Sequence, residues 1–318
     1  MPGFKQIMGA VTVVGLAAMA SALPALPKLN ERALEMYEIM ERQVTATGLP
    51  ANLTDVDILQ FALTLENLET AFYQQGFAKF PDSDFTAMGL TAQDITNLKM
   101  VGMTEATHVT TLMTAISASG TQPVAPCTYN FNFTTAQNMI ATANVLENIG
   151  VSAYLGAAPL VADKAILTVA AEIVTVESRH QTFIRTAQKV AAVPSAFDTP
   201  LGIRNVFSLA APFIQACPQG SNLAVTPFPA LTMTTPGEAM TAGSTLQLTS
   251  AAQGATACAF TNGGQTGGTA FTPFANGACT VPQGLAGDTY LNLASQLPAT
   301  GVLTDDITVA GPLVLQIS

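Results

Sequence analysis

The sequence predicts a mainly α-helical protein: an antiparallel four-helix bundle with one crossover, followed by a small all-β, sandwich-like module. Three observations lead to this prediction. Four long segments between Thr54 and Pro194 repeat apolar residues at the helical period. A long Pro-containing segment separates the second of these helices from the third. After Asn222 the helical periods stop, and Gly, Thr and Pro punctuate short alternating runs that are typical of strands.

The first two helices of the bundle are predicted over about 54–75 and 91–117. Each begins with a Thr that is followed three residues later by an Asp, which is the pattern of a capping box. These pairs are Thr54 with Asp57 and Thr91 with Asp94. A loop containing Pro81 is expected between the two helices.

The second pair of helices follows a linker over 120–133, which must cross between the pairs. The third helix is predicted to begin at Thr134 and to run to about Ala158, before Pro159. The fourth is predicted from about Ala162 to a point before Pro194. A shorter helix is expected within 203–215.

These elements give a predicted domain organisation. Residues 1–22 form a signal peptide, 23–53 an N-terminal helical extension, 54–192 the bundle, 193–221 a linker with a short helix, and 222–318 the β-module. The signal peptide is predicted because Lys5 precedes an apolar run and Ala20-Ser21-Ala22 is a cleavage site of the small-x-small type. An uncleaved anchor or a buried helix is the alternative interpretation of this segment.

Composition restricts the class of protein. The net charge is −10, and no basic cluster is present that could neutralise phosphates, so nucleic acid is not an expected partner. Charged residues make up only 10% of the chain, which suits an extracellular setting. We therefore expect a secreted protein, either free or associated with the cell wall. We expect no stable membrane insertion after signal cleavage.

Four cysteines agree with export, because an even number in a secreted chain indicates disulfides. Three pairings exist, and Cys127–Cys217 with Cys258–Cys279 is favoured because each bond then stays within one region. Two sequons, at Asn52 and Asn132, are compatible with glycosylation.

A repeated pattern predicts a functional site inside the bundle. Leu65-Glu66-Asn67 and Leu146-Glu147-Asn148 each place a Tyr seven residues after the Glu, namely Tyr73 and Tyr154. Residues seven apart share one face of a helix. Each copy is followed by a Glu-x-x-His pattern, whose two side chains also share a face. These residues are Glu105 and His108 in the first half, and Glu177 and His180 in the second; the chain has no other His.

Two metal ions are the predicted cofactor. Six residues are the predicted ligands: Glu66, Glu105, His108, Glu147, Glu177 and His180. Carboxylates with imidazoles suit iron, the favoured metal, with manganese or zinc as alternatives. Tyr73 and Tyr154 are predicted to orient the carboxylates as hydrogen-bond donors, or else to serve only as core residues. Glu69 is either a seventh, movable ligand or an edge carboxylate with a basic partner.

Residues 54–190 resemble the ferritin-like superfamily, whose members place this set of Glu and Glu-x-x-His residues on four helices. More narrowly, the chain resembles the exported ferritin-like proteins of fungi called stress-response proteins, which are related to plant desiccation-associated proteins. The resemblance is carried by residues 65–73, 146–156, 176–185, 206–214 and 309–312. It implies the fold and the two-metal site, but this family has no settled activity.

Three functions remain open from the sequence, and whether the protein is an enzyme is one of the open questions. The first is a redox or ferroxidase role in stress protection, with metal ions and peroxide or oxygen as partners. The second is metal sequestration, and the third is a structural extracellular role. The β-module has no Trp and only one Tyr, Tyr290, which disfavours a sugar-binding platform.

The additions at both ends of the bundle predict a monomer or small oligomer. A ferritin-type cage of 24 subunits needs the outer surface and the ends of the bundle to be free for many identical neighbours.

Overall fold

The computed structural model describes residues 53–219, 225–234 and 240–317. The predicted signal peptide, the predicted helical extension up to residue 52 and the sequon at Asn52 lie outside the described residues. Within those residues, no helix is both long enough and apolar enough to cross a membrane.

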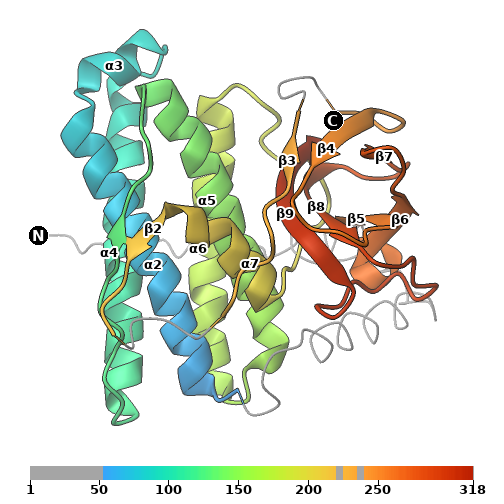
Figure 1. Ribbon diagram of the computed structural model, residues 1–318. Coiled ribbons are helices and arrows are strands. Elements are labelled where there is room, and N and C mark those ends of the chain that lie inside the picture. The colour runs from blue at the N-terminus through green and yellow to red at the C-terminus, as the bar shows by residue number, and fades with distance from the viewer. Residues whose placement is uncertain (1–52, 220–224, 235–239, 318) are drawn as a thin grey trace, which may run out of the picture. The chain divides into compact units, whose positions relative to one another are not determined.

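Four long helices form the bundle. They are α2 (Asp55–Lys79), α4 (Ala92–Ala118), α5 (Ala136–Ala157) and α6 (Lys164–Ala187). Figure 1 shows them side by side, with α2 packed on α4 and α5 packed on α6. The segment between α4 and α5 crosses the length of the bundle, so these two helices run in the same direction. The predicted four-helix bundle with one crossover is therefore confirmed.

The capping boxes lie where the sequence predicts them. Thr54 accepts a hydrogen bond from the amide of Asp57 (3.3 Å) and donates its own amide to the Asp57 carboxylate (2.9 Å). Thr91 and Asp94 form the same arrangement at the start of α4. The prediction for α5 is wrong by one residue, because the side chain that accepts from the backbone is that of Thr135 and not that of Thr134.

Short elements complete the helical region. The loop expected around Pro81 contains a short helix, α3 (Asp82–Ala87), which is anchored by the fully buried Phe85. Two single turns, η1 (Ala158–Leu160) and η2 (Ala211–Phe213), follow α5 and the predicted short helix α7 (Ile203–Ala210).

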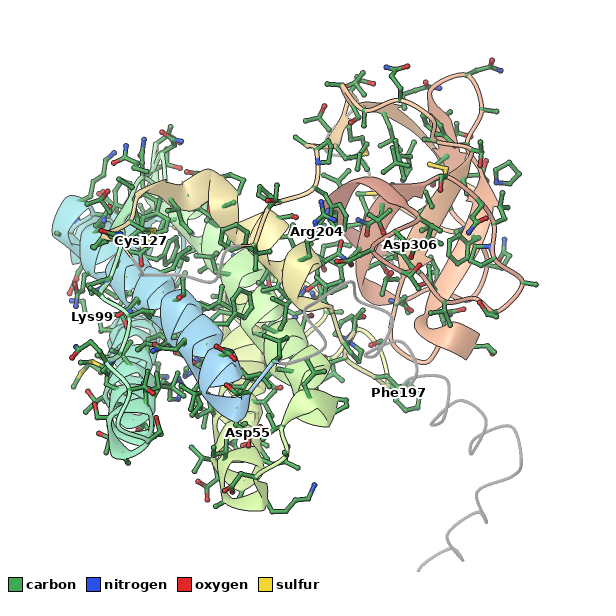
Figure 2. All side chains as sticks on the ribbon, turned by 60° about the horizontal axis from the view of Figure 1, so that its bottom comes forward. Asp55, Lys99, Cys127, Phe197, Arg204 and Asp306 are labelled. Carbon is green, nitrogen blue, oxygen red and sulfur yellow. A yellow bond between two sulfur atoms is a disulfide. The ribbon has the colours of Figure 1, made fainter. Side chains whose placement is uncertain are left out.

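A disulfide fixes the crossover to the segment that follows the bundle. Strand β1 (Thr128–Tyr129) lies in the crossover and pairs antiparallel with β2 (Ile214–Ala216). Cys127, which is labelled in Figure 2, precedes β1 and is bonded to Cys217 just after β2. Asn132 is exposed in the same crossover. The structure thus pairs these cysteines as the sequence analysis favours.

The C-terminal region consists of two antiparallel sheets, as the fold prediction states. The first has the order β3-β4-β7 and the second the order β6-β5-β8-β9. The strands are β3 (Thr232–Met233), β4 (Thr245–Thr249), β5 (Ala257–Thr261), β6 (Thr269–Pro273), β7 (Ala278–Thr280), β8 (Gly287–Ala294) and β9 (Thr308–Ile317), with the short turn η3 (Thr266–Gly268) before β6. Cys258 on β5 is bonded to Cys279 on β7 and so links the two sheets.

Strand β8 has two different faces, and all eight of its residues are buried. Leu291 and Leu293 belong to the apolar core between the sheets, together with Phe260. Tyr290 belongs instead to the apolar core of the helical bundle. This follows from the two-residue period of a strand, which sends successive side chains to opposite faces.

Gly156 supports a first prediction about the packing of the bundle. A Cβ atom at this position would lie 2.1 Å from the carbonyl oxygen of Leu201, whose amide donates to the carbonyl of Ser152 (3.0 Å). We expect Gly156→Ala to lower the free energy of unfolding by about 1–3 kcal/mol, because backbone must move. Denaturant unfolding measures this. Helix propensity alone predicts a gain from Gly to Ala, so a more stable variant would contradict the close approach.

Candidate metal centre

The six predicted ligand residues converge inside the bundle. Each of the four long helices contributes at least one of them. They are Glu66 on α2, Glu105 and His108 on α4, Glu147 on α5, and Glu177 and His180 on α6. All six are 8% exposed or less. The helical periodicity that places each Glu-x-x-His pair on one face also directs both side chains of the pair toward the bundle axis.

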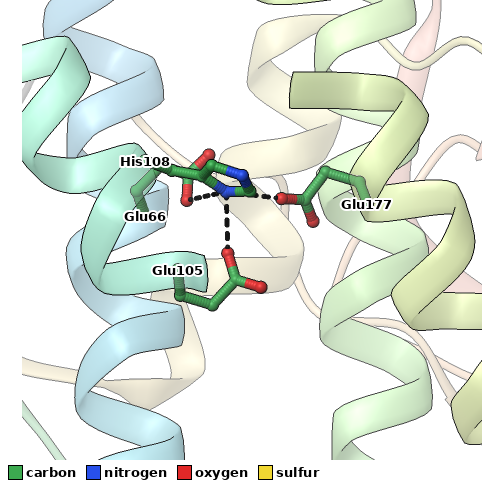
Figure 3. Close-up of side chains that lie close together, drawn as sticks. All are labelled: Glu66, Glu105, His108 and Glu177. Carbon is green, nitrogen blue, oxygen red and sulfur yellow. Dashed lines mark hydrogen bonds and ion pairs between the residues drawn. The ribbon is translucent and has the colours of Figure 1, made fainter. Parts of the chain in front are cut away.

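The first group surrounds His108. Its Nδ1 atom lies 3.0 Å from Glu177, 3.1 Å from Glu105 and 3.3 Å from Glu66 (Figure 3). The three carboxylates come from three different helices. Their oxygen atoms and Nδ1 all lie within 4.8 Å of one another, which is compact enough for one metal ion.

The second group surrounds His180. Its Nδ1 atom lies 2.7 Å from Glu105 and 3.2 Å from Glu147. Glu177 completes this group, within the same 4.8 Å limit. Glu105 and Glu177 belong to both groups, whereas Glu66 and His108 belong only to the first, and Glu147 and His180 only to the second. Two groups that share two carboxylates are compatible with two adjacent cation sites.

Protons alone do not satisfy this arrangement. The Nδ1 atom of His108 carries at most one hydrogen, yet three carboxylate oxygens face it. Within the described part of the chain, one oxygen of Glu66, one of Glu105 and both of Glu177 have no well-directed hydrogen bond. Buried oxygens without partners are costly. A cation that binds several oxygens at once would satisfy them, so the donor set fits a metal centre.

The imidazoles respond strongly to these carboxylates. Burial by itself would lower the pKa of His108, but the three carboxylates that face the ring, Glu105, Glu177 and Glu66, outweigh burial and raise the pKa to about 12. The pKa of His180 is likewise raised to about 10 against the effect of burial, by Glu105 and Glu147. Without metal, both rings are therefore cationic at neutral pH.

The carboxylates divide into two kinds. Burial would raise the pKa of Glu105, but its hydrogen bonds to His108 and His180 lower the pKa to about 2. Burial raises the pKa of Glu66 to about 7. It also raises the pKa of Glu147 and, assisted by the charge of Glu105, that of Glu177. Metal-free protein thus stores protons at this site, which a metal would displace.

The two tyrosines hydrogen-bond across the halves of the repeat. The hydroxyl of Tyr73 donates to Glu147, and the hydroxyl of Tyr154 donates to Glu66 (2.6 Å). Each tyrosine thus contacts the first Glu of the other copy of the repeat. These contacts leave one oxygen of each carboxylate directed toward its imidazole.

Glu69 is buried beside the centre. It is 4% exposed, and burial followed by the nearby charge of Glu177 raises its pKa well above the usual value. Glu69 therefore lies in the interior of the bundle and not at an exposed edge, and its role as a seventh ligand stays a prediction. Gly150 makes the space: a Cβ there would lie 3.2 Å from Glu69 and 2.9 Å from Glu177.

Thr104 was not predicted from the sequence. Its hydroxyl donates to the carbonyl of Val101 (2.7 Å), so its lone pairs can accept the Nε2 hydrogen of His180 (2.9 Å). This bond keeps the Nε2 hydrogen in place and leaves Nδ1 as the atom that faces the carboxylates. Many Thr side chains of α4 bond back to helix carbonyls, so nothing in the sequence distinguishes this one.

An apolar cavity of about 40 Å³ reaches the centre from one side. Glu66, Glu69, Gly150 and Tyr154 form its polar part. The rest of its wall is apolar and comes largely from α2, α5 and α6, for example Ile58, Leu65, Ala153, Val161 and Ala170. The volume has room for roughly two or three water-sized molecules.

The corresponding side near Tyr73 is filled. Tyr73 is fully buried and packs against Phe72 and Phe77, with ring centroids 5.1 and 5.9 Å away. Gly102 lies against it, since a Cβ there would be 2.7 Å from Tyr73. The two halves of the repeat therefore have the same ligand residues, but a cavity lies beside Tyr154 whereas side chains pack closely around Tyr73.

Comparison with known proteins agrees with this geometry. Residues 54–190 match the family described as the ferritin-like domain. Over 185 residues the chain is 29% identical to protein Rds1 of Schizosaccharomyces pombe, a match that covers 57% of this chain and 45% of Rds1. The chain thus matches less than half the length of that relative. The helical part of this protein is a ferritin-like domain, and its buried Glu and His cluster is compatible with a metal site.

The pKa shifts give a prediction for metal-free protein. Between about pH 6 and about pH 9 the folded state holds protons on His108 and His180 that the unfolded chain releases near 6.5, so rising pH favours unfolding. The stability that these rings contribute is complete below 6.5 and disappears as the pH rises through about 10 and about 12. Glu66, with its pKa at about 7, acts in the same direction.

We expect the free energy of unfolding to fall by at least about 1 kcal/mol over this range. Denaturant unfolding with a chelator at about pH 6 and at about pH 9 measures this change in the free energy of unfolding. Saturating manganese(II) should abolish or reverse it, because metal replaces the protons. Chelated protein that is equally stable or more stable at the higher pH would contradict the protonation described above.

Proposed function

We propose that the ferritin-like domain holds a carboxylate-bridged centre of two metal ions. The observation that carries this proposal is the set of three carboxylates that face the single Nδ1 atom of His108. One hydrogen cannot satisfy three acceptors, whereas a divalent cation binds several carboxylates together with an imidazole. Iron is the proposed metal, with manganese or zinc as alternatives.

The proposed roles follow from the two groups. Glu66 and His108 hold one ion, Glu147 and His180 hold the other, and Glu105 and Glu177 bridge the two. Four ionised carboxylates balance the charge of two divalent ions, which explains how these groups tolerate burial. Tyr73 and Tyr154 orient the two terminal carboxylates, and Thr104 orients the ring of His180. Glu69 is the proposed additional carboxylate ligand.

The proposed activity is redox chemistry with oxygen or peroxide, or oxidation of ferrous iron, in protection against stress. When bound, a pair of redox-active ions with open positions supplies sites for such an oxidant. The cavity beside Glu69 and Tyr154 supports this activity, because its apolar wall admits a small neutral molecule more readily than an ion. The alternative is a sequestering or structural protein whose metal is never turned over.

The proposed location is extracellular, including the cell wall. Two disulfides are consistent with an oxidising compartment. The proposed signal peptide is tested by determining the N-terminal residue of protein recovered from culture medium; intact residues 1–22 would contradict cleavage.

The proposed assembly is a monomer or small oligomer. The segment after the bundle is bonded to the crossover through Cys127 and Cys217, and a β-module follows it. We expect both additions to hinder the close packing of many identical bundles in a cage of 24 subunits. Light scattering tests this, and a particle of that size would contradict it.

Replacement of a histidine tests the ligand set. We expect His108→Ala and His180→Ala each to lower the metal content from about two ions per chain to about one or fewer, because each variant removes one end-on ligand. Elemental analysis with protein quantification measures this. Arg179→Ala is the matched control, since Arg179 is exposed on α6 next to His180. Unchanged metal content in both histidine variants would overturn the site.

Filling the cavity tests the redox activity. We expect Ala153→Leu to slow the oxidation of iron(II)-loaded protein by dissolved oxygen several-fold while metal content stays the same, because Ala153 lines the cavity and holds no metal. Stopped-flow absorbance measures the rate. Ala141→Leu on the exposed side of α5 is the control. If wild-type protein binds iron(II) and dissolved oxygen does not oxidise the bound iron, the sequestering alternative is favoured.

A further inference from the structure

Strand β8 presents a polar face to the helices. Asp288, Tyr290 and Asn292 alternate along the strand and therefore share one face, opposite Leu291 and Leu293. All three polar residues are buried, and Tyr290 and Asn292 are fully so. Buried polar groups on a strand need partners, and each of these three side chains has at least one partner on a helix.

Tyr290 contacts α5 next to a proposed ligand. Its hydroxyl accepts a hydrogen bond from the side-chain amide of Asn148 (2.9 Å) and shares another with Ser152 (2.6 Å). Asn148 directly follows Glu147 in the chain. The three partners are 3% exposed or less, so water does not replace these bonds.

Asp288 makes the equivalent contact with α6. Its carboxylate accepts from the side-chain amide of Gln181 (2.7 Å), which directly follows His180. The same amide group also donates to Asn148 (2.8 Å), so both of its hydrogens are used. Arg185, one turn further along α6, adds an ion pair to Asp288 at 3.3 Å.

These bonds form one continuous chain, from Tyr290 through Asn148 and Gln181 to Asp288. The chain ties α5 to α6 and ties both helices to a single strand. Rotation of either helix about its axis would leave a buried amide or carboxylate without its partner, which is unfavourable. Such rotation is the movement that would displace Glu147 and His180.

This chain of hydrogen bonds, from Tyr290 through Asn148 and Gln181 to Asp288, is called the brace below. It supports only one of the two helix pairs. In the described part of the chain, the side chains of β8 make hydrogen bonds to α5, α6 and α7 but none to α2 or α4. Glu147 and His180 belong to the second metal group only. Glu66 and His108, which belong to the first group only, have no such support from the β-module.

We propose that strand β8 positions the ligands of the second metal ion, with Tyr290 and Asp288 acting as positioning residues through Asn148 and Gln181. This inference rests on the two-metal centre proposed above. It assigns a function to the β-module: the module holds one of the two ions in place. Loss of the brace weakens the ion at Glu147 and His180 and leaves the ion at Glu66 and His108.

Manganese(II) binding to the full chain tests this inference. Tyr290→Phe keeps the ring in the core and removes only the hydroxyl, and Gln181→Met keeps the side-chain length and removes the amide. In both variants we expect the second binding step to weaken by about tenfold or more and the first to stay unchanged. Calorimetry resolves the steps, and electron paramagnetic resonance should show isolated manganese(II) where wild-type protein shows a spin-coupled pair.

Asn292→Ala is the matched control. Asn292 is buried on the same face of β8, but its amide bonds Asn205 of α7 and not α5 or α6. Thermal unfolding of all variants separates general destabilisation from loss of positioning. We expect the control to lose stability and keep both binding steps.

The outcomes separate the two proposals. If wild-type protein, Tyr290→Phe and Gln181→Met all bind two ions tightly, the positioning role is overturned and the metal centre stands. Equal weakening of both ions, or weakening of the second ion in the Asn292 control, would also overturn the positioning role. Wild-type protein that binds fewer than two ions would overturn the metal centre, and the positioning role with it.

Discussion

The structure depends on the burial of like charges. Glu66, Glu69, Glu105, Glu147 and Glu177 lie in the interior of one bundle, where an unpaired carboxylate is costly. Two imidazolium groups and shifted proton equilibria relieve this repulsion in the absence of metal. Two divalent cations at the proposed centre would relieve it more completely. The four helices, the crossover between their pairs and the hydrogen bonds of both tyrosines serve to hold these charges in one place.

Symmetry and asymmetry have different origins here. The six ligand positions repeat between the helix pairs, and each Tyr donates to the first Glu of the other pair. The remaining neighbours do not repeat. Glu69 corresponds to Gly150, Thr104 to Val176, and the packed surroundings of Tyr73 to a cavity beside Tyr154. The two groups of ligand residues thus have different surroundings, and two ions bound there would differ in their redox properties.

The sequence was informative where a period or spacing carried the information. The helix periods, the boxes at Thr54 and Thr91 and the paired Glu-x-x-His patterns predicted the bundle and the residues that meet inside it. Contacts between residues that belong to no periodic pattern could not be predicted from the sequence. Thr104 is one of many similar Thr residues on α4, and Asp288 and Tyr290 meet residues more than a hundred positions away. Strand order has the same difficulty, because several pairings would satisfy the same alternation.

The position of Tyr290 in the helical core has a consequence for folding. The side chain of Tyr290 contacts Ser152 and Asn148, which lie 138 and 142 residues earlier in the chain, so the final core requires contacts of long sequence separation. Such contacts close slowly and late. During synthesis the helices emerge first and remain incomplete on one side until the last strands are available. The helix contacts beside Glu147 and His180 are then complete only after β8 has been synthesised, 107 to 142 residues later in the chain than their helix partners.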